Sequence, residues 1–367
     1  MLQHPDVYAP WSQWSEEQRI HVATAYSNPL RWRTRRQLMN DFRRHMQASP
    51  NVVLHIGELA YGDRPFEVTV ASSERPAASG EAEHHSLLSA RCSPDVQLRT
   101  SHELWHKENI LNLVIQRFPP DWKYGAIIDA DFHMTRHDWA LEAIHQLQHY
   151  DFVQLFSTYT DLDRDQRPYR MNQSACSQYL RSSESQTGKA SRGDSADHNY
   201  RNFLFRQASE GPPYSVPAGK RSEIVGATGG AWAFRRSAFD AVGGLLDICI
   251  LGSADWHMAF ALLGAVNPAA ELKRAGKAYA EAILDWQERA AVLRGNVGCL
   301  ENHAVHFWHG SRSHRGYGDR WKILRDNEFD PRTDIFRDWQ GVWQLTCSKP
   351  KLRDDIRTYF RSRREDG

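Results

Sequence analysis

Short apolar runs alternate with segments of helical periodicity along most of this chain. Residues 52–56 and 124–128 are apolar runs of strand length, and the pattern predicts strands there. Residues 28–46 place four apolar side chains on one helical face, and residues 101–117 and 137–149 predict two further helices. Alternating strands and helices predict an α/β domain with a mostly parallel central sheet and helices on both faces.

Shorter elements complete this pattern. Strands are expected at residues 66–70, 95–100 and 151–156. Ser101 is the expected N-cap of the helix over residues 101–117, since a serine hydroxyl can accept the orphan N–H groups of a first turn. The α/β pattern resumes at residue 223.

The changes in pattern suggest how the chain is divided. Residues 1–48 are expected to form an N-terminal helical arm, residues 49–345 the α/β domain, and residues 346–367 a charged C-terminal helix and tail. Residues 160–222 interrupt the alternation. Because residues 172–200 are rich in Ser, Gln, Asp and Arg and poor in apolar residues, we expect an inserted loop or lid there.

Composition narrows the class of protein. Hydrophobic residues make up 41% of the chain and charged residues 25%, as in globular proteins. No apolar run approaches the roughly 20 residues of a membrane span, and the N-terminus has no secretory pattern. Five scattered cysteines without a CxxC pair argue against a disulfide framework. We therefore expect a cytoplasmic protein without a membrane partner. A net charge of +1 disfavours a dedicated nucleic-acid binder but leaves a local basic patch open.

Two acidic residues, Asp129 and Asp131, follow the predicted strand 124–128 directly. In open α/β sheets, ligands bind at the carboxyl ends of strands. Two crowded carboxylates repel each other unless a cation or a proton neutralises them. Their oxygens suit Mg²⁺ or Mn²⁺, with remaining positions left to water and phosphate. We interpret the pair as a candidate divalent-cation site; the alternative is two solvated acids at a strand end.

Three histidines, His303, His306 and His309, form a second candidate group. Imidazole binds many transition metals. If the segment is a strand, residues six apart share a face and residues three apart do not. His309, beside Gly310, is then the expected ligand, with His303 deeper on the same face. His306 is expected to point the other way, as a core or supporting histidine.

Three weaker features each have two interpretations. Residues 311–320 carry several cations and glycines, which suits a flap over a diphosphate or an ordinary basic loop. The pair Gly229 and Gly230 indicates either a close approach to a ligand or a tight turn. Asp255 is either a helix cap or a general base. No GxGxxG or P-loop pattern is present, so dinucleotide oxidoreduction and Walker-type ATP hydrolysis are not indicated.

In order along the chain, these segments resemble a GT-A glycosyltransferase. They are similar to the soluble family-2-like enzymes and, in the later half, to the galactosyltransferase C-terminal region. The resemblance covers roughly residues 50–345 and implies a GT-A fold, a divalent cation (Mn²⁺ or Mg²⁺) and a nucleoside-diphosphate-sugar donor, with a UDP-sugar as first expectation. The matching segments are residues 105–109, 127–132, 229–236, 241–259 and 306–320.

The resemblance also implies roles for individual residues. Asp131 would bind the metal with His309 as the second protein ligand, and Asp129 would contact the ribose or the sugar. Asp255 matches the catalytic base of the inverting members, although Gly252-Ser253-Ala254 before it departs from the usual pattern. The implied donor-binding residues are Glu58 and Arg99 near the nucleobase and ribose, Lys107, Trp232 beside the sugar, and Arg315, Tyr317 and Arg320 on the diphosphate.

Several alternatives stay open from the sequence. The acceptor hydroxyl belongs to a glycan or protein, or to a hydroxymethylated pyrimidine flipped out of phage DNA. In the DNA case, phosphates would be tracked by the insert and by arginines of residues 31–44 and 357–364. Phosphatases of the haloacid dehalogenase type also place DxD after a strand, but usually with Thr where His133 stands. A non-catalytic sugar- or nucleotide-binding module on the same scaffold is the third alternative.

Overall fold

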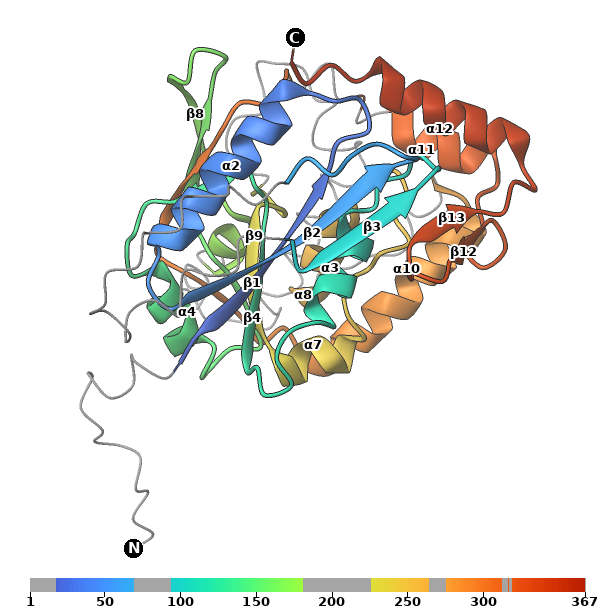
Figure 1. Ribbon diagram of the computed structural model, residues 1–367. Coiled ribbons are helices and arrows are strands. Elements are labelled where there is room, and N and C mark those ends of the chain that lie inside the picture. Colours follow the sequence, from blue (N-terminus) through green and yellow to red (C-terminus); the bar gives the residue numbers. More distant parts are fainter. Residues whose placement is uncertain are drawn as a thin grey trace, which may run out of the picture.

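The computed structural model describes residues 18–68, 94–180, 226–263, 275–311, 316 and 319–366. Its centre is a seven-stranded sheet (Figure 1). The strand order is β10-β6-β9-β4-β1-β2-β3. The strands are β1 (Ile20–Ser27), β2 (Val52–Tyr61), β3 (Val96–Thr100), β4 (Tyr124–Ile128), β6 (Phe152–Gln154), β9 (Ala231–Arg235) and β10 (Val297–Cys299).

The α/β class is confirmed, but the sheet is mixed. Strand β9 runs antiparallel to both of its neighbours, β4 and β6. The pairings β10–β6, β4–β1, β1–β2 and β2–β3 are parallel. The sheet is therefore mixed, and not mostly parallel as expected. Hydrophobic periodicity does not report strand direction, so the sequence pattern could not reveal this.

The first strand of the chain occupies the middle of this sheet. Residues 1–48 are thus not a separate helical arm, since β1 pairs with both β2 and β4. Polar residues interrupt the apolar pattern of β1, which hides it from a search for apolar runs. From β1 the chain moves outward to β2 and β3 and then returns to the other side of β1 as β4. The strand order reverses between β1 and β4, and in α/β sheets such a switch point is where ligands bind.

Helices cover both faces of the sheet (Figure 1). One face packs against α2 (Arg33–Ala48) and α4 (Trp139–Gln146), where Phe42 and Met46 join Ile20 and Trp139 in one core. The apolar stripe predicted for α2 is confirmed, since Leu38, Met39, Phe42 and Met46 are buried. The other face packs against α3 (Lys107–Ile115), α7 (Arg236–Val242), α8 (Ala254–Leu262) and α10 (Lys277–Ala290).

A second sheet of four strands lies beside the first, in the order β5-β11-β7-β8. In this sheet β11 is parallel to β7 and antiparallel to β5, so His306 lies across from Asp161 on one side and Phe132 on the other. The start of the expected insertion therefore forms strands, and residues 181–225 lie outside the described residues. The strands are β5 (Phe132–Met134), β7 (Thr158–Leu162), β8 (Pro168–Gln173) and β11 (His303–His306).

The C-terminal part adds short elements against this body. They are a 3₁₀ turn (Ala291–Leu293), α11 (Asp319–Asp326), β12 (Ile335–Arg337), β13 (Trp343–Leu345) and α12 (Pro350–Ser362). The predicted C-terminal helix is confirmed by α12. Within the described residues, no helix is both long and apolar enough to cross a membrane.

Two predicted boundaries are wrong for identifiable reasons. Residues 66–68 form no strand, because the main-chain N–H groups of Glu67 and Val68 donate to the buried Glu58 carboxylate instead of to a neighbouring strand. Residues 69 and 70 lie outside the described residues. The helix expected from Ser101 begins at Lys107. The preceding segment stays non-helical, with the Trp105 N–H donating to the Ile250 carbonyl at 2.8 Å.

Candidate functional site

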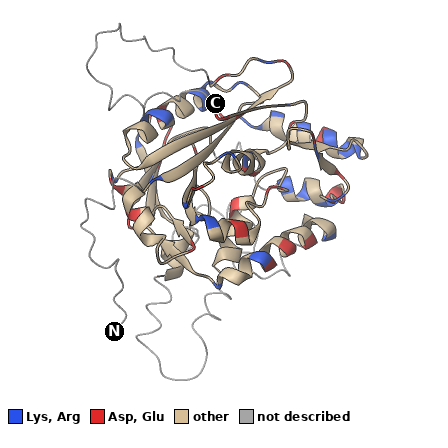
Figure 2. Ribbon diagram, turned by 60° about the horizontal axis from the view of Figure 1, so that its bottom comes forward, with Lys and Arg blue, Asp and Glu red and all other residues tan. Residues whose placement is uncertain are grey.

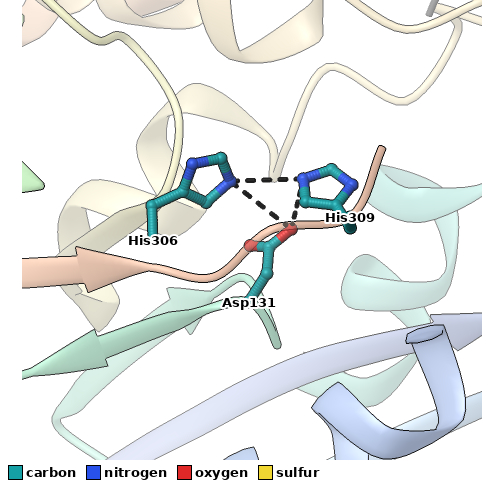
Figure 3. A group of neighbouring side chains, drawn as sticks. All are labelled: Asp131, His306 and His309. Atoms are coloured by element: carbon teal, nitrogen blue, oxygen red, sulfur yellow. Dashed lines mark hydrogen bonds and ion pairs between the residues drawn. The ribbon is translucent and has the colours of Figure 1, made fainter. Parts of the chain in front are cut away.

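One carboxylate and two imidazoles converge where the two sheets meet (Figure 3). His309 Nε2 lies 3.0 Å from Asp131 Oδ2, and His306 Nε2 lies 3.7 Å from the same oxygen. The two Nε2 atoms are 3.2 Å apart. All three ligand atoms fall within 4.8 Å of one another, which is the spacing that a single metal ion would require.

Local backbone structure brings these three side chains together. Asp131 lies between β4 and β5, and its carbonyl accepts the Phe307 N–H at 2.9 Å. Strand β11 ends at His306, so strand alternation no longer governs the next residues, and both His306 and His309 face Asp131. The expectation that His306 points away is therefore wrong. His303, the expected companion, contacts the hydroxyls of Thr158 and Thr160 at 2.9 and 3.0 Å instead.

A second carboxylate, that of Asp161, contacts the Nδ1 side of the His306 ring. Asp161 Oδ1 lies 2.6 Å from His306 Nδ1, and the Asp161 carboxylate is buried. Asn172 Nδ2 donates to the other Asp161 oxygen at 3.0 Å. When Nδ1–H donates to Asp161, the lone pair of Nε2 is directed at the cluster. Metal-binding histidines are held by carboxylates in this way. Sequence analysis missed Asp161, because only the pairing of β7 with β11 brings it to His306.

The chemistry of the donor set decides which ion it fits. Burial alone would raise the pKa of the Asp131 carboxyl, but the adjacent His309 and His306 hold this pKa well below its usual range. One carboxylate oxygen and two imidazole nitrogens suit a divalent transition metal such as Mn²⁺, whereas Mg²⁺ prefers oxygen ligands throughout. The residues present therefore fit a metal ion, and of the two expected ions they favour Mn²⁺.

The other aspartate of the pair, Asp129, lines an adjacent pocket of about 560 Å³, open mouth included. Lys107 Nζ lies 2.5 Å from Asp129 Oδ1, and both side chains are partly exposed. Burial lowers the pKa of Lys107, but Asp129, Glu108 and Asp255 together raise it above its ordinary value. Burial raises the pKa of Asp129, against the attraction of Lys107. A positive and a negative charge thus stand side by side at the pocket wall.

Asp255 lines the same pocket from the first turn of α8. The chain reaches this turn through Gly252 and Ser253, both with left-handed φ angles of 89° and 80°. Gly229 passes so close that a Cβ there would lie 2.6 Å from Asp255 Oδ2. The Thr228 hydroxyl donates to the same oxygen at 3.4 Å. Gly229 therefore allows a close approach between the backbone and the Asp255 side chain, whereas Gly230 lies against the Phe132 ring.

Trp232 and Arg320 also lie at this site. Trp232 is buried on β9, lines the pocket and donates its Nε1–H to the Thr228 carbonyl at 2.8 Å. Arg320 is buried on α11, and its Nη1 donates to the hydroxyl of Ser253, two residues before Asp255. Its predicted contact with a diphosphate stays a prediction. Arg315 and Tyr317 lie outside the described residues.

Glu58 and Arg99 do not line the pocket; both hold a loop at the ends of β2 and β3. The Glu58 carboxylate is buried and accepts main-chain N–H groups, including that of Val68 at 3.0 Å. Arg99 Nη1 donates to two carbonyls of the 62–64 turn, each at 2.8 Å, and the guanidinium lies 4.5 Å from the Phe66 ring centroid. Both side chains therefore stabilise the loop over residues 62–68.

Glu108 lines the pocket and was assigned no role by sequence analysis. It is only 4% exposed, and burial raises the pKa of its carboxyl to about 7. The signal in the sequence was its place in the segment 105–109 beside Lys107, but periodicity does not reveal that a glutamate is buried.

Two of the arginines considered for tracking DNA phosphates are neutralised within the chain. Arg35 lies 2.6 Å and Arg363 2.9 Å from the buried Glu365 carboxylate. In Figure 2, several of the outer helices carry both positive and negative residues.

No protein-family model matches the chain, and no curated protein matches it. Function is therefore inferred from the Asp131 cluster and the pocket beside it.

Proposed function

We propose that this protein is a metal-dependent glycosyltransferase, which moves a sugar from a nucleoside-diphosphate sugar to an acceptor hydroxyl. One observation carries the proposal. Asp129 and Asp131 follow the strand at the switch point of the sheet, and each belongs to a different set of side chains. Asp131 meets His306 and His309, whereas Asp129 shares a pocket with Lys107 and Asp255. The strand reversal at β1 and β4 supports the resemblance to the GT-A fold.

The difficulty in glycosyl transfer is the departure of a nucleoside diphosphate. Asp131, His306 and His309 would hold a divalent cation, which when bound supplies Lewis-acid neutralisation of the leaving diphosphate. Three protein ligands leave coordination positions for phosphate oxygens. The Lys107 ammonium at the pocket wall adds a preorganised positive charge close to the same place.

Asp129 and Asp255 would act on the sugar and on the acceptor. The Asp129 carboxylate, held by Lys107, accepts hydrogen bonds from hydroxyls of the donor. Asp255 lines the same pocket and would remove the proton of the acceptor hydroxyl as that hydroxyl attacks the anomeric carbon. In-line attack with one carboxylate base gives inversion at that carbon.

The acceptor we favour is a hydroxyl of a glycan or a protein. A DNA acceptor would need free cations to follow the phosphates. Arg35 and Arg363 instead pair with Glu365. A UDP-sugar is the first donor to test, in keeping with the resemblance to family-2-like enzymes.

A thermal-shift screen of nucleotide sugars with and without Mn²⁺ tests this proposal. A ligand that binds only the native state raises Tm according to its affinity. We expect a Mn²⁺-dependent rise with one nucleotide family, which is lost in Asp131→Ala. It should persist in Asp240→Ala, a matched control on the exposed face of α7. If no nucleotide sugar shifts Tm in either condition and none is hydrolysed, the proposal is wrong.

A further inference from the structure

The turn that leads into α8 is held by a buried arginine. Gly252 and Ser253 both have left-handed φ angles, of 89° and 80°. A serine in this conformation is strained and persists only where its surroundings hold it. Ser253 is the N-cap of α8, but among the described residues its hydroxyl caps no N–H group of the helix. The hydroxyl instead accepts a hydrogen bond from Arg320 Nη1.

The guanidinium of Arg320 also packs on the backbone of this turn. A Cβ added at Gly252 would lie 3.2 Å from Arg320 Nη1 and 3.5 Å from the Trp105 ring. The Trp105 N–H donates to the Ile250 carbonyl at 2.8 Å, so this tryptophan is tied to the same turn. Gly252 is therefore in close contact with both side chains, which leave the turn little room on this side.

The position of this turn sets the position of Asp255. Asp255 belongs to the first turn of α8, two residues after Ser253. The contact of its own carboxylate is long, since the Thr228 hydroxyl donates to Oδ2 at 3.4 Å. A general base must lie within hydrogen-bond reach of the proton that it removes, and a misplacement of about 1 Å can cost about 100-fold in rate. A change that moves the Ser253 turn therefore moves the carboxylate that we propose as the base.

Arg320 is poorly placed to bind the diphosphate, which is the role that the resemblance implies for it. Arg320 is only 7% exposed and is not among the described residues that line the pocket. An arginine that binds phosphate directs its N–H groups at the open site, whereas Nη1 here is directed at Ser253. The contacts of Arg320 within the protein therefore indicate another role.

We infer that Arg320 is a positioning residue, which holds the Gly252–Ser253 turn, thereby orients Asp255 toward the pocket, and does not bind the donor diphosphate. The inference rests on the proposed function, because it takes Asp255 as the base. Loss of a diphosphate ligand would weaken donor binding, whereas loss of a positioning residue slows the chemical step. Removal of Arg320 should leave donor binding unchanged, because the candidate metal ligands and Lys107 belong to other elements.

Arg320→Met tests this inference, since it keeps much of the side-chain length and removes the donor to Ser253. The substrate is the nucleotide sugar that gives the largest Mn²⁺-dependent rise in Tm, and hydrolysis is measured, with water in place of the acceptor. We expect kcat to fall about 100-fold, with KM for the nucleotide sugar and the calorimetric affinity for its nucleoside diphosphate changed less than about twofold. Arg320→Lys can still donate to Ser253 and should recover at least about tenfold of this loss.

Three further variants show whether Arg320 acts through the turn and Asp255. Ser253→Ala removes the acceptor of the same hydrogen bond, so it should reproduce the fall in kcat and add little to that of Arg320→Met. In the Asp255→Asn background, Arg320→Met should have no further effect on kcat, because no base is left to orient. Arg325→Met is the control on the same helix, since Arg325 is exposed and pairs with Asp326, and it should change neither kcat nor KM.

The outcomes separate this inference from the proposal beneath it. If Arg320→Met weakens binding of the nucleoside diphosphate at least about tenfold, Arg320 binds the diphosphate and the inference is wrong. If the wild type hydrolyses the nucleotide sugar but Ser253→Ala has the same kcat, the inference is also wrong while the donor site stands, and this variant decides if Arg320→Met does not fold. Losses that multiply between Arg320→Met and Asp255→Asn likewise overturn it. If no nucleotide sugar raises Tm and none is hydrolysed, the proposed function is wrong and the inference falls with it.

Discussion

His306 and Asp161 face each other across two strands, with Nδ1 and Oδ1 only 2.6 Å apart. The parallel register of β11 and β7 sets this distance, since the two residues are direct partners in it. The interaction fixes which imidazole nitrogen carries the proton and turns the other toward Asp131. A residue 30 positions beyond Asp131 in the chain thereby controls the candidate metal ligand.

Asp161→Asn should weaken metal binding without unfolding the protein. The amide can no longer hold the Nδ1–H tautomer reliably, and loss of such a supporting carboxylate typically costs 10- to 100-fold in metal affinity. Mn²⁺ titration by calorimetry measures the change. Asp163→Asn is the matched control, because Asp163 serves only the exposed turn of the same hairpin. Equal Mn²⁺ affinity in wild type and Asp161→Asn would contradict the metal role of His306.

Asp255→Asn should abolish transfer and leave donor binding intact. Removal of a general base typically lowers the rate about 10²- to 10⁴-fold, whereas the Asn side chain keeps the volume beside Gly229. Transfer rate, donor affinity and the anomeric configuration of the product are the three measurements, with Asp240→Asn as the control. An active Asp255→Asn enzyme, or a product with retained configuration, would refute the assignment of Asp255 as the base.

The buried Glu108 carboxyl makes stability depend on pH. Its pKa is raised to about 7 in the folded protein from an ordinary value of 4.5, so the folded state binds the extra proton between these values. Stability should therefore fall as pH rises from about 4.5 to about 7 and stay level above, by about 3 kcal/mol in total. Urea unfolding at pH 5 and pH 8 should show this slope in wild type relative to Glu108→Gln. Identical slopes in the two proteins would show that Glu108 is ionised throughout.

Glu365 anchors the C-terminal residues against the segment that carries His309 and Gly310. Its side chain is fully buried between Arg35 and Arg363. Gly310, next to His309, packs so tightly on this segment that an added Cβ would lie 2.5 Å from the Arg364 carbonyl. Glu365→Ala leaves two guanidinium groups without their partner, which typically costs about 3–5 kcal/mol. We expect Mn²⁺ affinity to fall as well, because the loop bearing His309 loses its support.

Two measurements test this anchor. Urea unfolding gives the stability loss, and Asp354→Ala, which removes an exposed pair on α12, should change it by less than about 1 kcal/mol. The folded pKa of Glu365 is lowered to about 2, so its contribution is present above pH 4.5 and lost as pH falls toward 2. Unchanged stability in Glu365→Ala would mean that the tail does not hold the loop.

Local patterns in the sequence determined much of the scaffold. The apolar stripe of α2 and the apolar run of β4 are properties of neighbouring residues, so periodicity finds them. The position of Asp129 and Asp131 after a buried strand follows from the same local pattern. His309 was also predicted correctly as a member of the cluster with Asp131. The α/β class rests on alternation of elements, which is also local information.

Only the tertiary structure decided the rest. The place of β1 at the centre of the sheet and the reversed direction of β9 depend on which strands pair. His306 joined the cluster because β11 ends there, and Asp161 reached it through a strand register that joins residues 145 positions apart. Glu58 accepts main-chain N–H groups of the loop over residues 62–68, and Glu108 is buried at the pocket wall. Pairing, register and burial are set by contacts between distant segments, and the periodicity of one segment contains no record of them.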